Sequence, residues 1–253
     1  MLSLHHVHKR FGGLHAVNDV SFTVASGTIK AVIGPNGAGK TTLFNLIAGN
    51  LPLSGGTITF DGKRIDGCQP HEIAAAGIAR TFQNIKLFKG MTALETVMVG
   101  RHIRSRGGFI AGMLNLPWTW QEERRIRNTA QELLDLLGIG ECGALEADSL
   151  AFGQQRAVEL ARALATEPRL LLLDEPAAGL NIYETAELAR LIRNIRDMGI
   201  TILLVEHDMS LVMDISDEIV VLNFGKKIAE GDPAAIQQDP EVIKIYLGEE
   251  ALT

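Results

Sequence analysis

One stretch of the sequence decides the expected fold: Gly34-Pro35-Asn36-Gly37-Ala38-Gly39-Lys40-Thr41, which fits the pattern G-x-x-x-x-G-K-[ST]. Glycines here permit a turn and a close approach, so that backbone N–H groups converge on phosphate oxygens. Lys40 is expected to reach the β- and γ-phosphates as a point charge, and the Thr41 hydroxyl to coordinate Mg²⁺. We include the adjacent Thr42 among the nucleotide-binding residues. The stretch predicts that the chain binds a nucleoside triphosphate.

The residues on either side agree with this interpretation. Ile29 to Ile33 are typical of a strand entering a sheet. Thr41 to Ala48 predict a helix whose positive N-terminal end faces the phosphates. A strand, a loop and a helix in this order form the setting that the motif requires.

Composition limits the classes of function. The chain has 253 residues, a formal net charge of −6 and 46% hydrophobic residues, close to an ordinary enzyme. This charge offers no general attraction to nucleic acid, so no nucleic-acid partner is expected. Two cysteines without C-x-x-C spacing disfavour a disulfide framework or a zinc site and fit a reducing cytoplasm. No apolar run approaches the ~20 residues that cross a bilayer.

The order of predicted elements indicates an α/β fold. Val20 to Val24 alternate as a strand, and Asp61-Gly62 between Thr57–Phe60 and Lys63–Ile65 predicts a tight hairpin. Uniformly apolar strands, such as Leu170–Leu173, alternate with helices in the second half and predict a mostly parallel sheet covered on both faces. A helical stripe of apolar residues lies in between, at Ile126, Ala130, Leu133, Leu134 and Leu137.

We therefore expect a P-loop NTPase core with an N-terminal antiparallel β subdomain and an inserted helical subdomain. The predicted boundaries are 1–82 and 150–253 for the nucleotide-binding core and 83–149 for the helical insertion.

A second motif completes the predicted chemistry. Leu170-Leu-Leu-Leu173-Asp174-Glu175-Pro176 is an apolar strand that ends in carboxylates. Asp174 is placed to hold Mg²⁺ directly or through water. Glu175, one residue later, is placed to polarise a water molecule for attack on the γ-phosphate.

The segment Leu150-Ala151-Phe152-Gly153-Gln154 carries a family resemblance. It is similar to the L-S-G-G-Q signature of the ATP-binding subunits of ABC transporters, and the other motifs follow in that family's order. The resemblance implies a head-to-tail dimer in which residues 150–154, at the end of the insertion, cap ATP held by the partner's phosphate loop. Ala151 replaces the serine, which removes one γ-phosphate donor, and Phe152 replaces the first glycine.

The resemblance assigns further site residues. Gln83 matches the glutamine that touches Mg²⁺ and water, and His207 matches the histidine that contacts the γ-phosphate. Phe11 stands where the family has an aromatic residue stacked on adenine. Asn181 replaces the common aspartate at the end of the loop after Pro176. The implied catalytic set is Lys40, Gln83, Glu175 and His207.

Three classes of ABC protein compete: the energising subunit of an importer, the ATPase of a lipopolysaccharide-type extraction system, and a soluble member without a membrane partner. The motifs around Gly153, Asp174 and His207 look like those of the branched-chain amino acid importer's ATP-binding subunit. That resemblance implies two transmembrane permease subunits, a second ATP-binding subunit, either identical or similar, and indirectly an extracytoplasmic substrate-binding protein. It also implies peripheral attachment at the cytoplasmic face of the inner membrane. The transported substrate and the direction of transport come from the resemblance alone.

Overall fold

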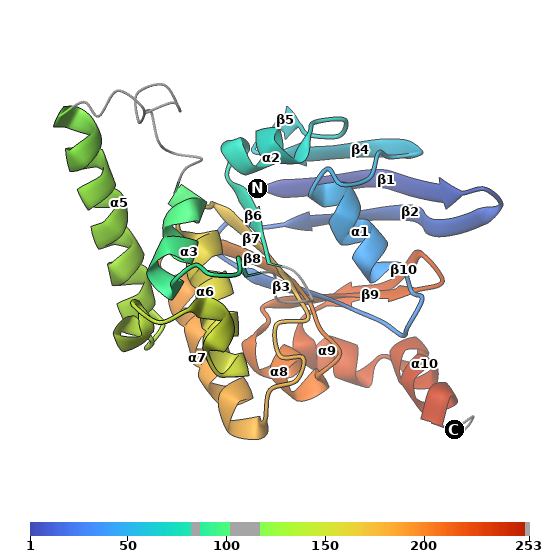
Figure 1. Cartoon of the computed structure of the whole chain (residues 1–253). Coiled ribbons are helices and arrows are strands. Elements are labelled where there is room, and N and C mark those ends of the chain that lie inside the picture. Colours follow the sequence, from blue (N-terminus) through green and yellow to red (C-terminus); the bar gives the residue numbers. More distant parts are fainter. Residues whose placement is uncertain (82–86, 102–116, 251–253) are drawn as a thin grey trace. The chain divides into compact units, whose positions relative to one another are not determined.

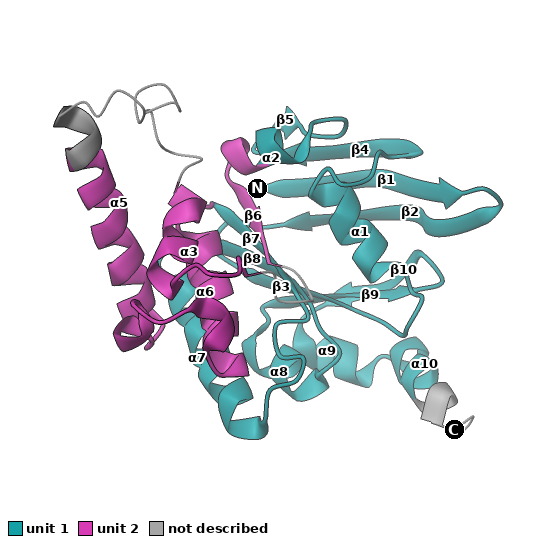
Figure 2. Ribbon diagram, in the orientation of Figure 1, with its two compact units in different colours: residues 1–73, 169–253 teal, residues 74–168 magenta. Residues whose placement is uncertain are grey.

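The computed structural model describes residues 1–81, 87–101 and 117–250 and divides into two compact units (Figure 2). Unit 1 comprises residues 1–73 and 169–253, and unit 2 comprises residues 74–168. The boundaries 83–149 proposed for the helical insertion stay a prediction.

Unit 1 begins with an antiparallel sheet, whose strands lie side by side in Figure 1 in the order β2-β1-β4-β5. Its strands are β1 (Leu2–Phe11), β2 (Leu14–Val24), β4 (Gly55–Phe60) and β5 (Lys63–Arg64). The hairpin predicted at Asp61-Gly62 is confirmed. Phe60 pairs with Lys63, and both turn residues have positive φ, 48° and 76°, as a type I′ turn requires.

A second sheet of unit 1 runs in the order β10-β9-β3-β8-β7. These strands are β3 (Ile29–Ile33), β7 (Leu170–Asp174), β8 (Thr201–Val205), β9 (Glu218–Asn223) and β10 (Lys226–Gly231). β3 pairs in parallel with β8 and β9, and β7 with β8, whereas β10 returns antiparallel to β9. Every residue of β3, β7 and β8 is buried, which explains their continuous apolar sequences. The predicted mostly parallel sheet is confirmed.

The helices of unit 1 follow the ends of these strands. They are α1 (Lys40–Ile47), α7 (Ile182–Asp197), α8 (Met209–Ile215), α9 (Pro233–Gln238) and α10 (Pro240–Glu250). The helix α2 (Pro70–Ala76) begins in unit 1 and ends in unit 2. Aspartate or asparagine caps several of them; the Asp208 side chain, for example, accepts hydrogen bonds from the N–H groups of Ser210 and Leu211 at the start of α8.

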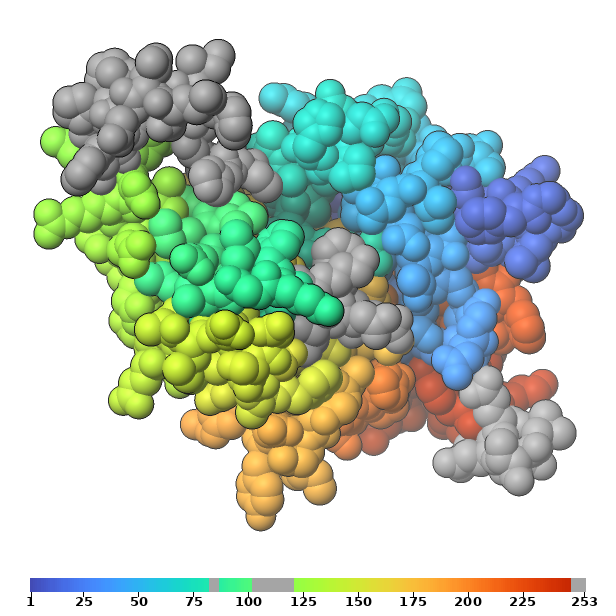
Figure 3. Space-filling model, in the orientation of Figure 1, coloured from blue at the N-terminus to red at the C-terminus, as the bar shows by residue number. Residues whose placement is uncertain are grey.

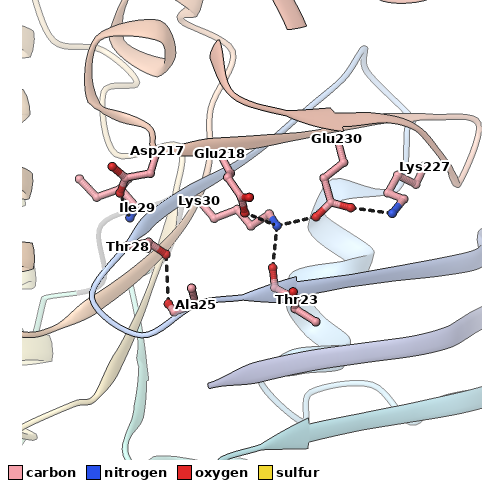
Figure 4. A network of polar contacts seen from close by, with 9 residues as sticks. All are labelled: Thr23, Ala25, Thr28, Ile29, Lys30, Asp217, Glu218, Lys227 and Glu230. Carbon is pink, nitrogen blue, oxygen red and sulfur yellow. Dashed lines mark hydrogen bonds and ion pairs between the residues drawn. The ribbon is translucent and has the colours of Figure 1, made fainter. Parts of the chain in front are cut away.

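Lys30 is an exception to the apolar interior, because its side chain is only 1% exposed. Its Nζ donates to the Thr23 carbonyl oxygen at 2.6 Å, to Glu218 Oε2 at 2.9 Å and to Glu230 Oε1 at 2.5 Å (Figure 4). Lys227 Nζ lies 2.6 Å from Glu230 Oε2. This cluster joins β2 of the antiparallel sheet to β3, β9 and β10, and therefore fixes the two sheets of unit 1 against each other.

Unit 2 is built mainly from helices. It contains β6 (Ile78–Arg80), α3 (Ala93–Arg101), α5 (Pro117–Leu136), α6 (Phe152–Leu164) and the short 3-10 turns η2 (Gly140–Cys142) and η3 (Ala147–Ser149). The predicted apolar stripe lies on α5 and just beyond it, where Ala130, Leu134 and Leu137 are buried. Gly100 on α3 allows close packing, because a Cβ there would lie 2.2 Å from the Arg162 carbonyl oxygen on α6.

Candidate nucleotide-binding site

The phosphate loop connects β3 to α1, as the sequence predicts. Gly34, Gly37 and Gly39 all have positive φ, at 147°, 79° and 101°. Two of them also face neighbouring backbone. A Cβ on Gly34 would lie 2.1 Å from the Leu222 carbonyl oxygen, and one on Gly39 would lie 2.3 Å from the Ala16 carbonyl oxygen. The glycines thus allow β9 and β2 to pack against the loop, besides leaving its backbone free to curl.

Lys40 is the first residue of α1 and is 8% exposed. Its Nζ donates to the carbonyl oxygens of Gly34 and Pro35, the latter at 3.0 Å. The ammonium group is thus held over the phosphate loop by the loop's own carbonyls. An arriving phosphate finds a positive charge already positioned at the N-terminus of a helix.

A pocket of about 410 Å³ opens over this loop, a volume in the range of small-molecule sites. Its lining combines the loop with aromatic and aliphatic side chains: Phe11, Leu14, His15, Ala16, Asn36, Gly37, Ala38, Gly39, Lys40, Thr41, Thr42, Glu175 and Phe224. Phe11 is 47% exposed, Leu14 66% and Phe224 84%, so apolar side chains are available for contact. A polar loop beside apolar side chains suits the triphosphate and the base of a nucleotide.

Phe224 is a pocket residue that the sequence analysis missed. It forms a two-residue turn with Gly225 between β9 and β10, and both residues have positive φ, 45° and 77°. Asn-Gly is the usual pair in such a turn, so the phenylalanine there was a signal of function. The turn is fixed by hydrogen bonds from Asn18 N to Gly225 O and from Gly225 N to Ala38 O. In Figure 3 the dark-blue N-terminal strands and the orange β9–β10 hairpin lie on the same side of the light-blue α1.

The second motif lies at the end of β7. Asp174 is the last residue of this strand and is 2% exposed. Glu175 follows it and lines the same pocket as the phosphate loop. Its φ is +48°, a conformation that costs a non-glycine residue energy and is retained where the surrounding structure imposes it. Asp61 has the same φ in a tight turn, whereas Glu175 has it at the wall of the pocket, which agrees with the role predicted for Glu175.

His207 follows β8 and lies next to the same carboxylate. Its Nδ1 is 4.0 Å from Glu175 Oε2, and its side chain is 64% exposed. The fold therefore brings together the predicted base and the predicted γ-phosphate contact from neighbouring parallel strands. Gln83, predicted to contact Mg²⁺, lies outside the described residues.

The signature segment lies in unit 2, at the start of α6. Ala151 is the N-cap residue, and its N–H donates to Gln154 Oε1 at 3.2 Å. The helix begins at Phe152, and the Gln154 side chain serves as a cap in its first turn. Phe152 is 48% exposed, and the Arg156 guanidinium lies 5.5 Å from the centre of its ring.

Asn181 is the N-cap of α7. Its side-chain oxygen accepts from Tyr183 N at 2.9 Å and from Glu184 N at 3.1 Å, and Glu184 Oε2 accepts from Asn181 N at 2.8 Å. Asparagine and aspartate are nearly equivalent at this position. The replacement noted in the sequence therefore leaves the start of α7 intact.

Comparison with known proteins decides the family. The ABC transporter family model matches residues 17–178, which include the phosphate loop, the signature segment and the carboxylates after β7. The chain belongs to the ABC transporter family. A second model, described as branched-chain amino acid ATP-binding cassette transporter, matches residues 226–251.

Individual relatives of this ABC protein cover nearly its whole length. The high-affinity branched-chain amino acid transport ATP-binding protein BraF of Pseudomonas aeruginosa is 48% identical over 241 residues, 95% of this chain and 94% of that protein. The corresponding protein LivG of Escherichia coli is 44% identical over 250 residues, 98% of each.

Solved structures confirm the predicted fold. A nucleotide-free ATP-binding cassette from an ABC transporter has a TM-score of 0.85 and 32% identity, covering 97% of this chain and 98% of that one. The ADP conformation of an ATP-binding cassette of an ABC transporter has a TM-score of 0.86 and 33% identity, covering 98% of each chain. Among the helices in the described ranges, none combines the length and apolar character that crossing a bilayer requires.

Proposed function

We propose that the chain is the ATP-hydrolysing subunit of an ABC importer that takes up branched-chain or related amino acids. The observation that carries the proposal is the pocket in which the phosphate loop and Glu175 line one cavity. Identities of 44–48% to ATP-binding proteins of branched-chain amino acid transport support the transported class.

Binding of ATP begins at the phosphate loop. The Lys40 ammonium group leaves the loop carbonyls and binds the β- and γ-phosphates instead. The N–H groups of the loop donate to the oxygens of these phosphates. Phe11 stacks on the adenine at the pocket wall. Thr41 in the pocket, Asp174 at the end of β7 and Gln83 would hold Mg²⁺ through oxygen ligands, and the bound ion would neutralise charge on the phosphates.

Hydrolysis requires a base and a γ-phosphate contact. Glu175 accepts the proton of the attacking water, a role worth roughly 10²–10⁴-fold in rate. His207, whose Nδ1 lies 4.0 Å from Glu175 Oε2, is close enough to contact the γ-phosphate beside that water. Loss of the γ-phosphate then removes the contacts made by Lys40 and His207.

Closure of a head-to-tail dimer couples this chemistry to transport. Residues 150–154 of each subunit cap the ATP that the other subunit binds, and that second ATP-binding subunit is either identical or similar. To shift the ratio of closed to open dimers from 1:99 to 99:1, ATP must bind the closed state about 5.5 kcal/mol more tightly than the open state, or roughly half of that for each nucleotide. We place the dimer at the cytoplasmic face of the inner membrane, against two transmembrane permease subunits that receive substrate from an extracytoplasmic binding protein.

The chemistry is tested by two variants of the full chain. Lys40→Ala is expected to lose tight Mg-ATP binding. Glu175→Gln is expected to bind Mg-ATP normally and to hydrolyse it at least a hundredfold more slowly. Near-normal turnover of Glu175→Gln would mean that the base lies elsewhere.

The transport assignment is tested by affinity capture of Glu175→Gln from ATP-treated native membranes, followed by mass spectrometry. Two multispanning proteins, a second ATPase and an amino-acid-type binding protein are the expected partners. Envelope-extraction components, ribosomes or DNA would overturn the importer assignment and leave the ATPase chemistry standing.

A further inference from the structure

Glu206 is a fully buried carboxylate, 0% exposed, that the mechanism above does not use. It follows β8 directly and precedes His207 in the sequence. Burying a carboxylate is expensive unless hydrogen bonds satisfy it. Glu206 is therefore expected to have hydrogen-bond partners near the ends of β7 and β8.

The two oxygens of Glu206 bind two different loops. Oε1 accepts from Ala177 N at 2.7 Å, in the loop between β7 and α7. Oε2 accepts from His207 N at 2.9 Å and is 3.3 Å from Asp208 N, in the loop between β8 and α8. One side chain thus connects the loop that contains Glu175 with the loop that contains His207.

The same carboxylate lies beside the catalytic groups. Glu206 Oε2 is 3.7 Å from His207 Nδ1, and that nitrogen is 4.0 Å from Glu175 Oε2. Glu175 keeps its strained φ of +48° with its own N–H bound to the Val205 carbonyl oxygen at 2.9 Å. Two residues later, the bond from Ala177 to Glu206 fixes the continuation of the loop. The backbone on both sides of Glu175 is therefore anchored to the end of β8.

We propose that Glu206 is a positioning residue for ATP hydrolysis: it holds the strained Glu175 and the side chain of His207 at a fixed separation around the attacking water. This inference rests on the proposed function. It assigns no contact with nucleotide to Glu206. Its effect is on the rate of the chemical step, because small displacements of catalytic groups cost up to 10²-fold while phosphate binding depends on the separate loop around Lys40.

Glu206→Gln is a sharp perturbation because it preserves size. A glutamine has one acceptor oxygen, so its NH₂ group must face an N–H donor of one of the two loops. We expect kcat for Mg-ATP hydrolysis to fall at least tenfold, with the Mg-ATP dissociation constant changed less than threefold. Glu206→Asp, shorter by one bond of about 1.5 Å, cannot span both loops and is expected to behave similarly. It replaces Glu206→Gln in the test if the latter is unfolded by circular dichroism.

Two controls separate positioning from general loss of stability. Lys30→Met disturbs the cluster near the start of β3, at the opposite end of the strand from the phosphate loop, and is expected to lose stability while retaining kcat. The double variant Glu206→Gln/Glu175→Gln is expected to lose less kcat than the product of the two single effects, because Glu206 acts in part through that base.

The inference is overturned if folded Glu206→Gln retains kcat within twofold, or if its loss of kcat equals its loss of Mg-ATP affinity. It is also overturned if Glu206→Gln reduces kcat by the same factor in the unaltered chain and in the Glu175→Gln variant. Failure of the proposed function looks different: the unaltered chain would then neither bind nor hydrolyse Mg-ATP.

Discussion

The buried Lys30 cluster yields a prediction whose magnitude follows from its contacts. Lys30→Ala removes three buried methylene groups, worth about 2 kcal/mol at about 0.8 kcal/mol each. It also leaves the Thr23 carbonyl, bound at 2.6 Å, without this donor, at a cost of about 1–3 kcal/mol for an unsatisfied buried acceptor. We assign little to the ion pairs themselves, because the Glu218 and Glu230 side chains are 53% and 26% exposed and remain partly hydrated. The expected loss in free energy of unfolding is about 3–5 kcal/mol.

Lys30→Met keeps most of the apolar stem, with sulfur in place of one methylene, and removes the ammonium group. Its expected loss is about 1–3 kcal/mol, roughly 2 kcal/mol less than that of Lys30→Ala. Urea denaturation followed by circular dichroism measures both values, provided that different probes give coincident transitions. Equal losses for the two variants, or a loss below about 1 kcal/mol for Lys30→Ala, would refute this account of the cluster.

The electrostatic contribution of the Lys30 cluster is tested by measuring the free energy of unfolding of the unaltered chain and of Lys30→Met as a function of pH. Burial alone would raise the pKa of Glu230, but hydrogen bonds from Lys227 and Lys30 outweigh it and hold this pKa below its ordinary value of 4.5. A lowered folded-state pKa stabilises the fold above the unfolded pKa, and this stabilisation disappears as pH falls through the folded value. The stability difference between the unaltered chain and Lys30→Met is therefore expected to narrow below pH 4.5. If this stability difference stayed constant until Glu230 was fully protonated, the interaction of Glu230 with Lys30 would not contribute to stability.

Three further variants probe the nucleotide site. Gly39→Ala places a Cβ 2.3 Å from the Ala16 carbonyl oxygen at a φ of +101° and is expected to weaken Mg-ATP binding at least tenfold by calorimetry; unchanged affinity would show that the loop adapts. Phe224→Ala removes an apolar pocket wall and is expected to weaken ATP binding about 3–10-fold while leaving inorganic triphosphate binding unchanged. Tyr183→Ala, equally exposed but not part of the pocket lining, is its control, and equal effects of the two would exclude a contact of Phe224 with the nucleoside. Ala151→Ser restores the family's hydroxyl at the N-cap of α6 and is expected to keep or slightly raise ATPase activity, so a severe loss in a steady-state assay would contradict the signature assignment.

Local sequence was sufficient wherever the physical cause lies within a few residues. The phosphate loop, the strand before it and the Asp61-Gly62 turn were all predictable, because positive φ favours glycine and a fully buried strand needs continuous apolar residues. The start of α6 also depends on a contact within a few residues, because the Gln154 side chain accepts a hydrogen bond from the Ala151 N–H three residues earlier.

The residues that complete the site were harder to recognise from the sequence. The role of Glu206 could not be predicted from the sequence. None of the residues next to it indicates that the N–H of Ala177, 29 residues earlier, donates to its carboxylate. For Phe224 the unusual turn residue was a local signal, but its place in the lining of the same pocket as Phe11 depends on the pairing of β9 with β3.

The sequence by itself determined that this chain has a phosphate loop, a strand ending in carboxylates, a signature segment and membership of the ABC transporter family. These features are local patterns, and each needs only its own residues to be recognised. The tertiary structure alone decided which distant segments meet. The sheet order β9-β3-β8-β7 places β9 against Gly34 and brings the Glu175 and His207 loops together around Glu206. Strand order depends on long-range pairing and the burial of whole faces, so no short stretch of sequence contains it.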